Sequence, residues 1–357
     1  MKIAHVVSAF PDRVTGPRNS VTMLSKYLNL IEGVESRVYT DVADEMFSFN
    51  DEVVSPLKTI DVACFDVVVF SNVYNKNSAE LARECRRKKV PYVISPRSSL
   101  IKSSLYKSWW KKLLFIYGYG FSYLKGSVAI HFLTEEERDF SVLKGQSSFV
   151  VGNIVLSGAI GNQEKQKIIG FLGRYDIRHK GLDVLLKGAA LAKEDLKRSG
   201  WKIVLHGPDF NGGKSKLEMM LKLYGLDGVV TLNGALHGPE KNEFYDRVSV
   251  FVHTSRYEGQ PQSVMEAMTR RCAILVTPGT NMGRIVKDSF CGEVVDFTPS
   301  SIANFLFSLS RDVFNIEDHQ DRARAYSLER FSGPVVANDF LGELLKLLGN
   351  RTSLEAS

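Results

Sequence analysis

The sequence contains few cysteines and no long apolar run. No two of its four cysteines form a Cys-x-x-Cys pair; they are Cys64, Cys85, Cys272 and Cys291. No stretch reaches the ~18–20 apolar residues that a transmembrane helix needs. Met1 leads directly into an apolar strand pattern, Ile3–Val7, rather than into a signal peptide. We therefore expect a cytoplasmic protein with reduced thiols, and not a disulfide scaffold or a membrane-spanning protein.

Three motifs of cofactor and metal chemistry are also missing. The chain has no Asp-x-Asp, no Gly-x-Gly-x-x-Gly, and no His, Cys and Asp cluster with the spacing of metal ligands. The sequence therefore predicts an activity that needs no metal and no dinucleotide cofactor.

Length and charge define the class of protein further. At 357 residues, with 44% hydrophobic and 24% charged residues, the chain predicts a soluble protein of two domains. The net charge of +6 is unevenly distributed, because residues 81–125 carry eleven basic side chains and one acidic side chain, Glu84. Such a segment favours phosphate, either of lipid or of nucleic acid. No known nucleic-acid-binding module accompanies it, so we expect no nucleic-acid partner.

Apolar strand patterns alternate with helical patterns along both halves of the chain. The first series begins with a strand at 2–8 and a helix from about Asn19, and it continues to a strand at 91–95. The periodicity breaks at 151–167, which we interpret as a linker, and a second series starts with a strand at 167–173. Strands that alternate with helices predict parallel sheets covered on both faces, so the fold class is α/β with two Rossmann-like domains.

The most informative stretch is 255–268, which lies between the strand patterns 248–253 and 273–276. We expect a loop that contains Glu258 and then a helix with Pro261 in its first turn and Glu266 about one turn inside. The free amides and positive dipole end of a helix N-terminus suit a diphosphate. Carboxylates accept hydrogen bonds from the hydroxyls of a sugar or ribose. Together these groups describe a nucleotide-sugar site, although a loop and a helix with surface carboxylates is the alternative.

A second loop carries two cations in front of a helix. It reads Arg174-Tyr175-Asp176-Ile177-Arg178-His179-Lys180-Gly181 and follows the strand at 167–173. Arg174 and Lys180 supply positive charge where a diphosphate with a charge of about −2 would bind, and they can stabilise it as it departs. A solvated basic loop is the alternative reading.

These two motifs together are similar to those of a known enzyme family. The run EGQPQSVMEAM at 258–268 and the run GRYDIRHKG at 173–181 resemble the signatures of the GT4 family of retaining glycosyltransferases, which have the GT-B fold. The resemblance implies two facing Rossmann-like domains with an active-site cleft between them, at 1–160 for the acceptor and 166–333 for the nucleotide-sugar donor. It also implies that a last helix within 334–357 packs back on the first domain.

The resemblance implies a role for each site residue. Glu258 would hold the donor sugar, and Arg174 and Lys180 would bind and stabilise the diphosphate. Glu266 would accept hydrogen bonds from the ribose, and Gly16 would close on the phosphates unless it is a plain turn glycine. The other expected donor contacts are Gly259, Gln260, Gln262, Ser263, Val264, Asn233 and Ala235.

Arg97 and His131 are expected near the acceptor or the donor sugar. Arg97 follows a strand, in a Pro-Arg-Ser run where many relatives read Pro-Arg-Gly. A structural arginine and a satisfied interior histidine are the respective alternatives.

The stretch 100–125 is basic and aromatic and contains no acidic residue. Such a segment is typical of a helix on the inner membrane surface, which would suit an acceptor on a polyprenyl diphosphate. An amphipathic helix that packs Trp110, Leu114 and Tyr117 on its own domain is the alternative. The expected function is therefore sugar transfer from a UDP- or GDP-sugar to a glycan in bacterial surface polysaccharide synthesis. A nucleotide-sugar 2-epimerase and an inactive nucleotide-binding relative stay open.

Overall fold

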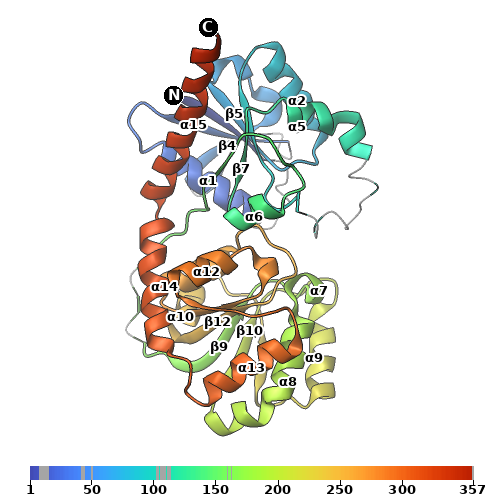
Figure 1. Ribbon diagram of the computed structural model, residues 1–357, viewed down its shortest axis with the longest axis vertical. Helices are drawn as coiled ribbons and strands as arrows, with labels where there is room; N and C mark the ends of the chain where they lie inside the picture. The colour runs from blue at the N-terminus through green and yellow to red at the C-terminus, as the bar shows by residue number, and fades with distance from the viewer. Residues whose placement is uncertain are drawn as a thin grey trace. The chain divides into compact units, whose positions relative to one another are not determined.

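The computed structural model divides into two compact units (Figure 1). It describes residues 1–7, 16–41, 45–49, 51–101, 104, 110, 114–158, 160–161 and 163–355. Unit 1 comprises Met1–Ile154 and Ser332–Ser357, and unit 2 comprises Val155–Phe331. Each unit is an α/β structure built on its own sheet, as the alternating pattern of the sequence predicts.

The sheet of unit 1 has the strand order β3-β4-β2-β1-β5-β6-β7-β8 among the described residues. Its neighbours are parallel except for the edge pair β3 and β4, which is antiparallel. The strands are β1 (Lys2–Val7), β2 (Glu35–Thr40), β3 (Phe47–Phe49), β4 (Glu52–Pro56), β5 (Val67–Ser71), β6 (Tyr92–Ser95), β7 (Ala129–Phe132) and β8 (Ser148–Val150).

Helices cover both faces of this sheet. The larger ones are α1 (Gly16–Leu28), α2 (Lys76–Arg87) and α15 (Gly333–Glu355), and the short ones are α5 (Phe121–Lys125) and α6 (Glu135–Phe140). α1 and α15 contact each other and share one apolar cluster, so α15, the last helix of the chain, belongs to unit 1 (Figure 1). α2 and α5 contribute to the apolar cluster on the opposite face. The two clusters use alternate residues of the same strands, which is the period of a β-strand.

The sheet of unit 2 has the order β11-β10-β9-β12-β13-β14, and every described pair is parallel. The strands are β9 (Gln166–Leu172), β10 (Lys202–His206), β11 (Val230–Asn233), β12 (Val248–His253), β13 (Ala273–Val276) and β14 (Gly292–Val294). The chain moves from β9 toward one edge and then returns to β12 to build toward the other edge. The order of the strands therefore reverses between β9 and β12.

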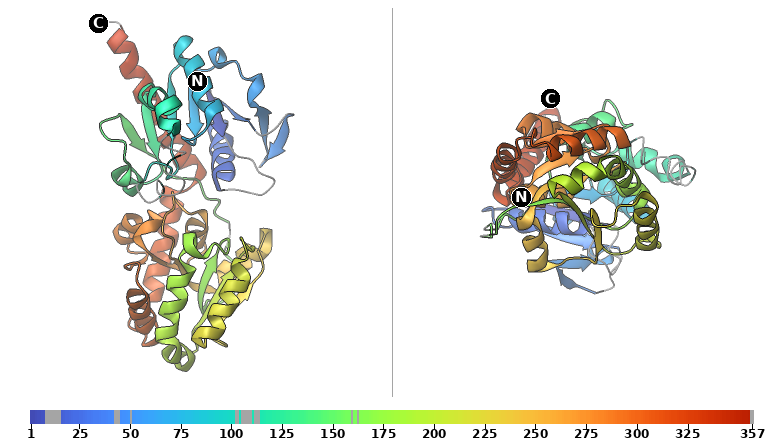
Figure 2. Two further views of the ribbon diagram at one scale, coloured as in Figure 1. Left: turned by 90° about the vertical axis from the view of Figure 1, so that its right-hand side faces the viewer. Right: turned by 90° about the horizontal axis from the view of Figure 1, so that it is seen from below.

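Two groups of helices cover the two faces of the second sheet (Figures 1 and 2). α8 (Leu182–Ser199), α9 (Gly213–Tyr224) and α13 (Pro299–Ser310) pack on one face. The opposite face is covered by α10 (Gly238–Arg247), α11 (Gln262–Thr269), α12 (Gly283–Ser289) and α14 (Ile316–Arg330). The short helix α7 (Ile177–Lys180) precedes α8. The strands are buried on both faces, which is why they read as nearly continuous apolar runs in the sequence.

Two details differ from the expectations. α1 begins at Gly16 and not near Asn19. Pro261 is the N-cap residue of α11, with φ −70° and ψ 118°, and so stands one residue before the helix. It fits there because a cap residue keeps an extended backbone. Much of the segment 100–125 lies outside the described residues.

Candidate active site

The two sequence motifs follow adjacent strands of unit 2. The loop with Arg174 follows β9, and the loop with Glu258 follows β12, which pairs with β9 in parallel. Parallel neighbours end at the same edge, and here they flank the point where the strand order reverses. In open α/β sheets ligands bind outside the carboxyl ends of the strands at such a point. The fold therefore places both motifs where a ligand is expected.

Hydrogen bonds connect the two loops directly. The Thr254 hydroxyl donates to the Lys180 carbonyl at 3.0 Å, and the Arg256 amide donates to the His179 carbonyl at 2.9 Å. His179 Nε2 lies 2.8 Å from the Tyr257 carbonyl, and because a carbonyl only accepts, this nitrogen carries the proton. These bonds fix the relative position of the two motifs within unit 2.

Gly181 is the closest point of approach between the loops. Its φ of +65° lies in the left-handed region, and it serves as the C-cap of α7 and the N-cap of α8. A Cβ atom at this position would lie 2.0 Å from the Thr254 carbonyl oxygen. Both the conformation and the space therefore require glycine. The final glycine of the motif at 173–181 is thus explained by geometry.

Lys180 and Glu258 form the centre of the site. Lys180 Nζ lies 2.5 Å from Glu258 Oε1, and the two side chains are 13% and 15% exposed. The same oxygen accepts from Ser255 Oγ at 3.1 Å and lies 3.5 Å from Nε2 of His253, a fully buried residue at the end of β12. The Asn281 side-chain amide donates to the Glu258 backbone carbonyl at 2.5 Å. Lys180, Ser255 and His253 therefore orient the Glu258 carboxylate, and Asn281 holds the backbone of the same residue.

Opposing effects set the ionisation of this carboxylate. Burial favours its neutral form, but Lys180, His253 and His179 together lower the pKa of Glu258 well below its ordinary value. Burial and then Lys180 lower the pKa of His253 to about 4, so this imidazole is neutral at pH 7. At neutral pH the site therefore contains a Glu258 carboxylate beside the Lys180 ammonium.

Glu266 is also held by side chains from another helix. Its Oε1 lies 2.7 Å from Lys241 Nζ, and its Oε2 accepts from the Tyr245 hydroxyl at 3.0 Å. Both partners are on α10, which precedes β12. An ionised carboxylate has about four acceptor positions, so Glu266 keeps acceptor capacity for a further hydroxyl.

Arg174 lies beside an aromatic ring, and the residue after it anchors the loop. The Arg174 guanidinium carbon is 4.8 Å from the centroid of the Phe210 ring, in a cation–π arrangement. The buried Tyr175 hydroxyl donates to the carbonyls of Leu205 and Asn233, at 2.9 and 2.6 Å. Tyr175 thereby ties the loop to the ends of β10 and β11 and leaves Arg174 exposed on top.

The start of α11 offers fewer free amides than a complete helix N-terminus. The Val264 amide donates to the Pro261 carbonyl at 3.1 Å, and the Val264 side chain is fully buried in the core. The amides of Gln262 and Ser263 precede it at the helix start. Gln260 is buried, and Gly259 lies beside it in the loop.

Asn233 and Ala235 are at and just after the end of β11. Asn233 Nδ2 lies 3.4 Å from His206 Nε2, on the end of the neighbouring strand. All the expected donor contacts except Gly16 therefore belong to unit 2. Gly16 is the first residue of α1 in unit 1.

Arg97 and His131 belong to unit 1. Arg97 follows β6 with a φ of +47°, and its Nη1 donates to Asn153 Oδ1 at 3.2 Å. His131 on β7 is buried, donates from Nε2 to the Val151 carbonyl at 2.8 Å, and stacks on Phe149. These are the contacts of an interior histidine, whereas Arg97 is at the strand end that the sequence predicts.

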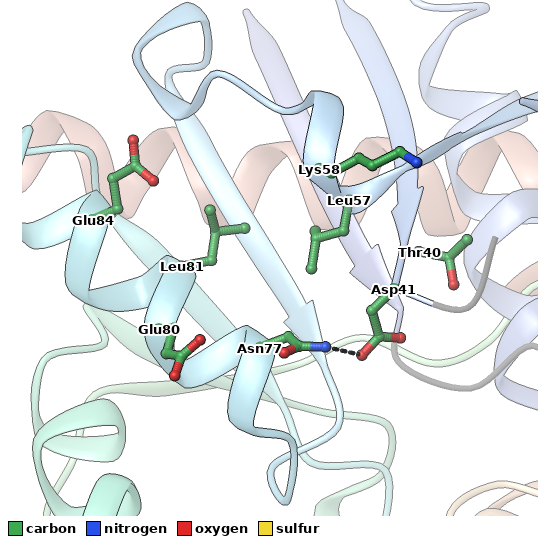
Figure 3. A pocket seen from close by; sticks show the side chains of 8 residues that line it. All are labelled: Thr40, Asp41, Leu57, Lys58, Asn77, Glu80, Leu81 and Glu84. Carbon is green, nitrogen blue, oxygen red and sulfur yellow. Dashed lines mark hydrogen bonds between the residues drawn. The ribbon is translucent and has the colours of Figure 1, made fainter. Parts of the chain in front are cut away.

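One pocket of unit 1 has unsuitable chemistry for a diphosphate (Figure 3). It lies between the end of β2, the segment after β4 and α2, and the Asn77 amide donates to Asp41 Oδ2 across it at 3.1 Å. Three of its side chains are carboxylates; the lining residues are Thr40, Asp41, Leu57, Lys58, Asn77, Glu80, Leu81 and Glu84. An acidic lining repels anions, so we do not place the donor there.

Sequence reasoning missed several residues of the site. Tyr175 lies inside the second motif, and His253 ends the strand before the first one, but neither position carries a local signal of its role. Lys241 and Tyr245 contact Glu266 from a helix 25 and 21 positions earlier in the chain. The spacing of Lys241 and Tyr245 by four residues, which places them on one helix face, was the only available signal.

Comparison with known proteins finds one family model that matches part of the chain. Residues 156–326 match the family model described as "Glycosyl transferases group 1". A comparison with curated proteins finds no match.

The fold is shared with solved glycosyltransferases. The structure of Anabaena Alr3699/HepE in complex with UDP and glucose is similar over 97% of this chain and 100% of that chain, with a TM-score of 0.74 and 13% identity. WaaG, "a glycosyltransferase involved in lipopolysaccharide biosynthesis", is similar over 95% and 98%, with a TM-score of 0.66 and 14% identity. Sucrose-phosphate synthase from Thermosynechococcus elongatus is similar over 100% of both chains, with a TM-score of 0.70 and 13% identity.

These findings bear on the class of protein in two ways. The match at 156–326 covers nearly all of unit 2, the unit that carries both motifs, so the predicted enzyme class, a glycosyltransferase, is confirmed. The α/β fold with two mostly parallel sheets is confirmed by its likeness to the solved GT-B structures.

Proposed function

We propose that the protein transfers a sugar from a nucleotide-sugar to a hydroxyl group of a glycan acceptor, with retention of anomeric configuration. The observation that carries the proposal is the Lys180–Glu258 pair at the strand-order reversal of unit 2. It combines a cation for a diphosphate with a carboxylate for sugar hydroxyls at one point. The donor is a UDP-sugar in the first instance, because the similar structure of HepE contains UDP and glucose.

The residues of unit 2 act on the donor in stages. Arg174, Lys180 and the Gln262 and Ser263 amides bind the diphosphate, Glu266 accepts from the ribose, and Glu258 with Gly259 and Gln260 holds the sugar. As the bond from the sugar to the diphosphate breaks, negative charge grows on the leaving phosphate, and the two cations stabilise it. The acceptor hydroxyl attacks the same face of the sugar, and the departing phosphate takes its proton. This scheme uses no metal and no cofactor.

The two carboxylates of the site are not arranged as the pair of a glycosidase. Glu266 contacts Lys241 and Tyr245 on α10, and Glu258 contacts Lys180 from the other motif. The two carboxylates therefore face different partners, one for the ribose and one for the sugar. A glycosidase instead aims both at one glycosidic bond.

The experiment that tests the function is a thermal shift series with UDP, GDP, ADP, CMP and dTDP. A nucleotide at 100 times its Kd adds about 2.7 kcal/mol to the stability of the unit that binds it, a shift of several degrees. We expect UDP to give the largest shift. If none of the five nucleotides shifts the transition, the proposed transferase activity is wrong. An inactive relative that binds some other ligand would then be favoured.

Substitution Glu266→Ala tests the ribose contact. We expect the Kd of UDP to rise about tenfold or more, because a hydrogen bond to a charged group contributes ~1.5–3 kcal/mol. Isothermal titration measures this affinity. Glu243→Ala, which removes an exposed carboxylate from α10, is the matched control and should bind UDP normally. Unchanged affinity in Glu266→Ala would remove this carboxylate from the site.

The epimerase alternative is tested with donor alone. Incubation of the protein with the UDP-sugar in the absence of acceptor, followed by NMR of the sugar, should show no C2 epimer. Accumulation of the epimer would replace the transferase proposal, and the anomeric coupling of a transferred product tests retention in the same spectra.

We further propose that the acceptor is lipid-linked and that residues 100–125 contact the inner membrane surface. Among the described residues, no helix is both long and apolar enough to cross a membrane. Three large apolar side chains of the segment are exposed: Trp110 at 52%, Leu114 at 66% and Phe121 at 61%. With the lysines of the segment they form the apolar and basic composition of an interfacial anchor. Bacterial surface polysaccharide synthesis is the setting that fits such an acceptor.

Cosedimentation with vesicles tests the membrane contact. We expect the protein to bind vesicles that contain anionic lipid and to release them at high salt, because the attraction is partly electrostatic. The double substitution Leu114→Ser and Phe121→Ser should weaken binding about tenfold or more, since each buried apolar side chain contributes ~1.5–3 kcal/mol. Leu191→Ser and Leu223→Ser, at exposed sites in unit 2, form the control. Equal binding by both double variants would refute the anchor.

A further inference from the structure

Buried polar side chains lie on one face of the unit 1 sheet, in the carboxyl-terminal halves of its strands. His5 on β1 pairs with Val69, and Val69 pairs with Val93 on β6, so the three residues form one row across the sheet. Ser95 lies two residues beyond Val93 and so on the same face, and Arg97 follows it as the chain leaves the strand. The strand ends of a parallel sheet are where ligands bind.

Several atoms of this group have no hydrogen-bond partner. Within the described part of the chain, His5 Nε2, Ser95 Oγ and Arg97 Nε are buried and unpartnered. His5 and Ser95 are each 1% exposed. A buried donor without a partner is unfavourable, so native proteins seldom keep several of them on the same face of one sheet. The arrangement is therefore that of a site that a ligand completes.

Arg97 brings an uncompensated positive charge to this group. No carboxylate of the described residues lies within ion-pair distance of its guanidinium, and Asn153, which accepts from its Nη1, is neutral. Glu137 in α6, an acid whose charge acts on Arg97, already accepts from the backbone amides of Ser98 and Leu133. Burial lowers the pKa of Arg97 to about 10, so the side chain stays charged but desolvated at neutral pH.

The positive charge of Arg97 also affects the imidazole of His5. Burial, and after it the charge of Arg97, lowers the pKa of His5 to about 3. His5 is therefore neutral and can donate a hydrogen bond from Nε2 while it adds no charge of its own. The turn that holds Arg97 is also strained, since Arg97 and Ser98 both have positive φ, +47° and +67°. Such backbone strain is unfavourable and collects at functional sites, which favours a functional reason for the turn.

We propose that Arg97, His5 and Ser95 bind a phosphate group of the acceptor. A guanidinium matches the oxygens of a phosphate with two parallel hydrogen bonds, and neutral imidazole and hydroxyl donors complete the set. The proposal rests on the proposed function, in which unit 1 binds the acceptor. It specifies an acceptor with a phosphate, such as a prenyl diphosphate carrier.

Binding to the full-length protein with UDP present at saturation tests this site. UDP occupies the nucleotide site, so a second ligand reports on another position. The probes are inorganic phosphate, geranyl diphosphate and, as the uncharged control, geraniol. We expect geranyl diphosphate and phosphate to raise the melting temperature by about 2 °C or more near saturation, and geraniol to have no effect.

The substitution Arg97→Gln gives the decisive comparison. It should weaken geranyl diphosphate binding about tenfold or more, because a charge-assisted contact is lost. Arg83→Gln, which removes an exposed charge from α2 in the same unit, should bind like wild type. The melting temperature of ligand-free Arg97→Gln should equal or exceed that of wild type, because a desolvated cation without a counter-ion destabilises the fold. A purely structural arginine would instead make the variant less stable.

Each contrary result has a separate meaning. Unchanged geranyl diphosphate binding in Arg97→Gln, or a ligand-free melting temperature several degrees below wild type, overturns the phosphate site. A tenfold loss of UDP affinity in this variant overturns the assignment to the acceptor, because the donor phosphate would then bind Arg97. A melting temperature that rises with inorganic phosphate but not with geranyl diphosphate also overturns the assignment to the acceptor. Failure of wild type to bind UDP contradicts the proposed function instead.

Discussion

The substitution Lys180→Ala is expected to lower turnover at saturating donor by about 100-fold or more. Lys180 is the cation nearest to Glu258, at 2.5 Å, and its side chain is only 13% exposed. Loss of one preorganised group that stabilises developing charge typically costs 10²–10³ in turnover, or about 2.7–4 kcal/mol. The measurement is kcat from release of UDP at saturating donor, with folding confirmed by circular dichroism at the assay temperature.

The design must separate catalysis from stability. Lys180→Ala leaves the Glu258 carboxylate largely buried without its main counter-ion, and breaking such a pair costs up to about 3–5 kcal/mol. The double substitution Lys180→Ala and Glu258→Gln removes this unpaired charge, so it should recover thermal stability but not turnover. Lys187→Ala on the exposed side of α8 is the charge-matched control and should be fully active. Turnover of Lys180→Ala within a few-fold of wild type would place the diphosphate elsewhere.

Much of the fold was predictable because parallel sheets and their covering helices have simple apolar patterns in the sequence. Strands buried on both faces, such as 248–253 and 273–276, are apolar throughout, and the helices between them have a clear 3.6-residue period. Helix starts were less predictable. The run from Gly16 to Asn19 carries no apolar period, yet α1 includes it. Pro261 was expected inside α11 but caps it.

The candidate site was predictable only where its chemistry is local. Arg174, Lys180, Glu258 and Glu266 lie in two short motifs, and the adjacency of β9 and β12 brings the motifs together. The groups that orient these side chains come from other elements. Tyr175 acts through the ends of β10 and β11, and no spacing rule connects it with Asn233, 58 residues away. The buried group at Arg97 has the same origin, because only the strand register aligns it with His5.

The substitution Gly181→Ala should damage both the fold and the nucleotide site. Gly181 has a φ of +65°, so alanine adds ~1–2 kcal/mol of backbone strain. Its Cβ would also lie 2.0 Å from the Thr254 carbonyl oxygen, and relief of such overpacking costs a further ~1–3 kcal/mol. Because the Thr254 hydroxyl bonds to the Lys180 and Gly181 carbonyls, any displacement moves Lys180 as well. We expect a lower melting temperature and a UDP affinity reduced about tenfold, since each 1.4 kcal/mol corresponds to a factor of ten.

The other end of the same helix supplies a matched control. Gly200 caps α8 at its C-terminus with a similar φ of +78°, but a Cβ there would meet nothing within 4 Å. Gly200→Ala therefore carries the backbone strain without the contact, and it should lose ~1–2 kcal/mol while it binds UDP normally. Urea denaturation and UDP titration of both variants measure the difference. If the two variants lose equal stability and both bind UDP normally, the approach of Thr254 to Gly181 does not hold the two motifs together. If Gly181→Ala alone loses UDP binding, the contact between the motifs is what positions Lys180 for the diphosphate.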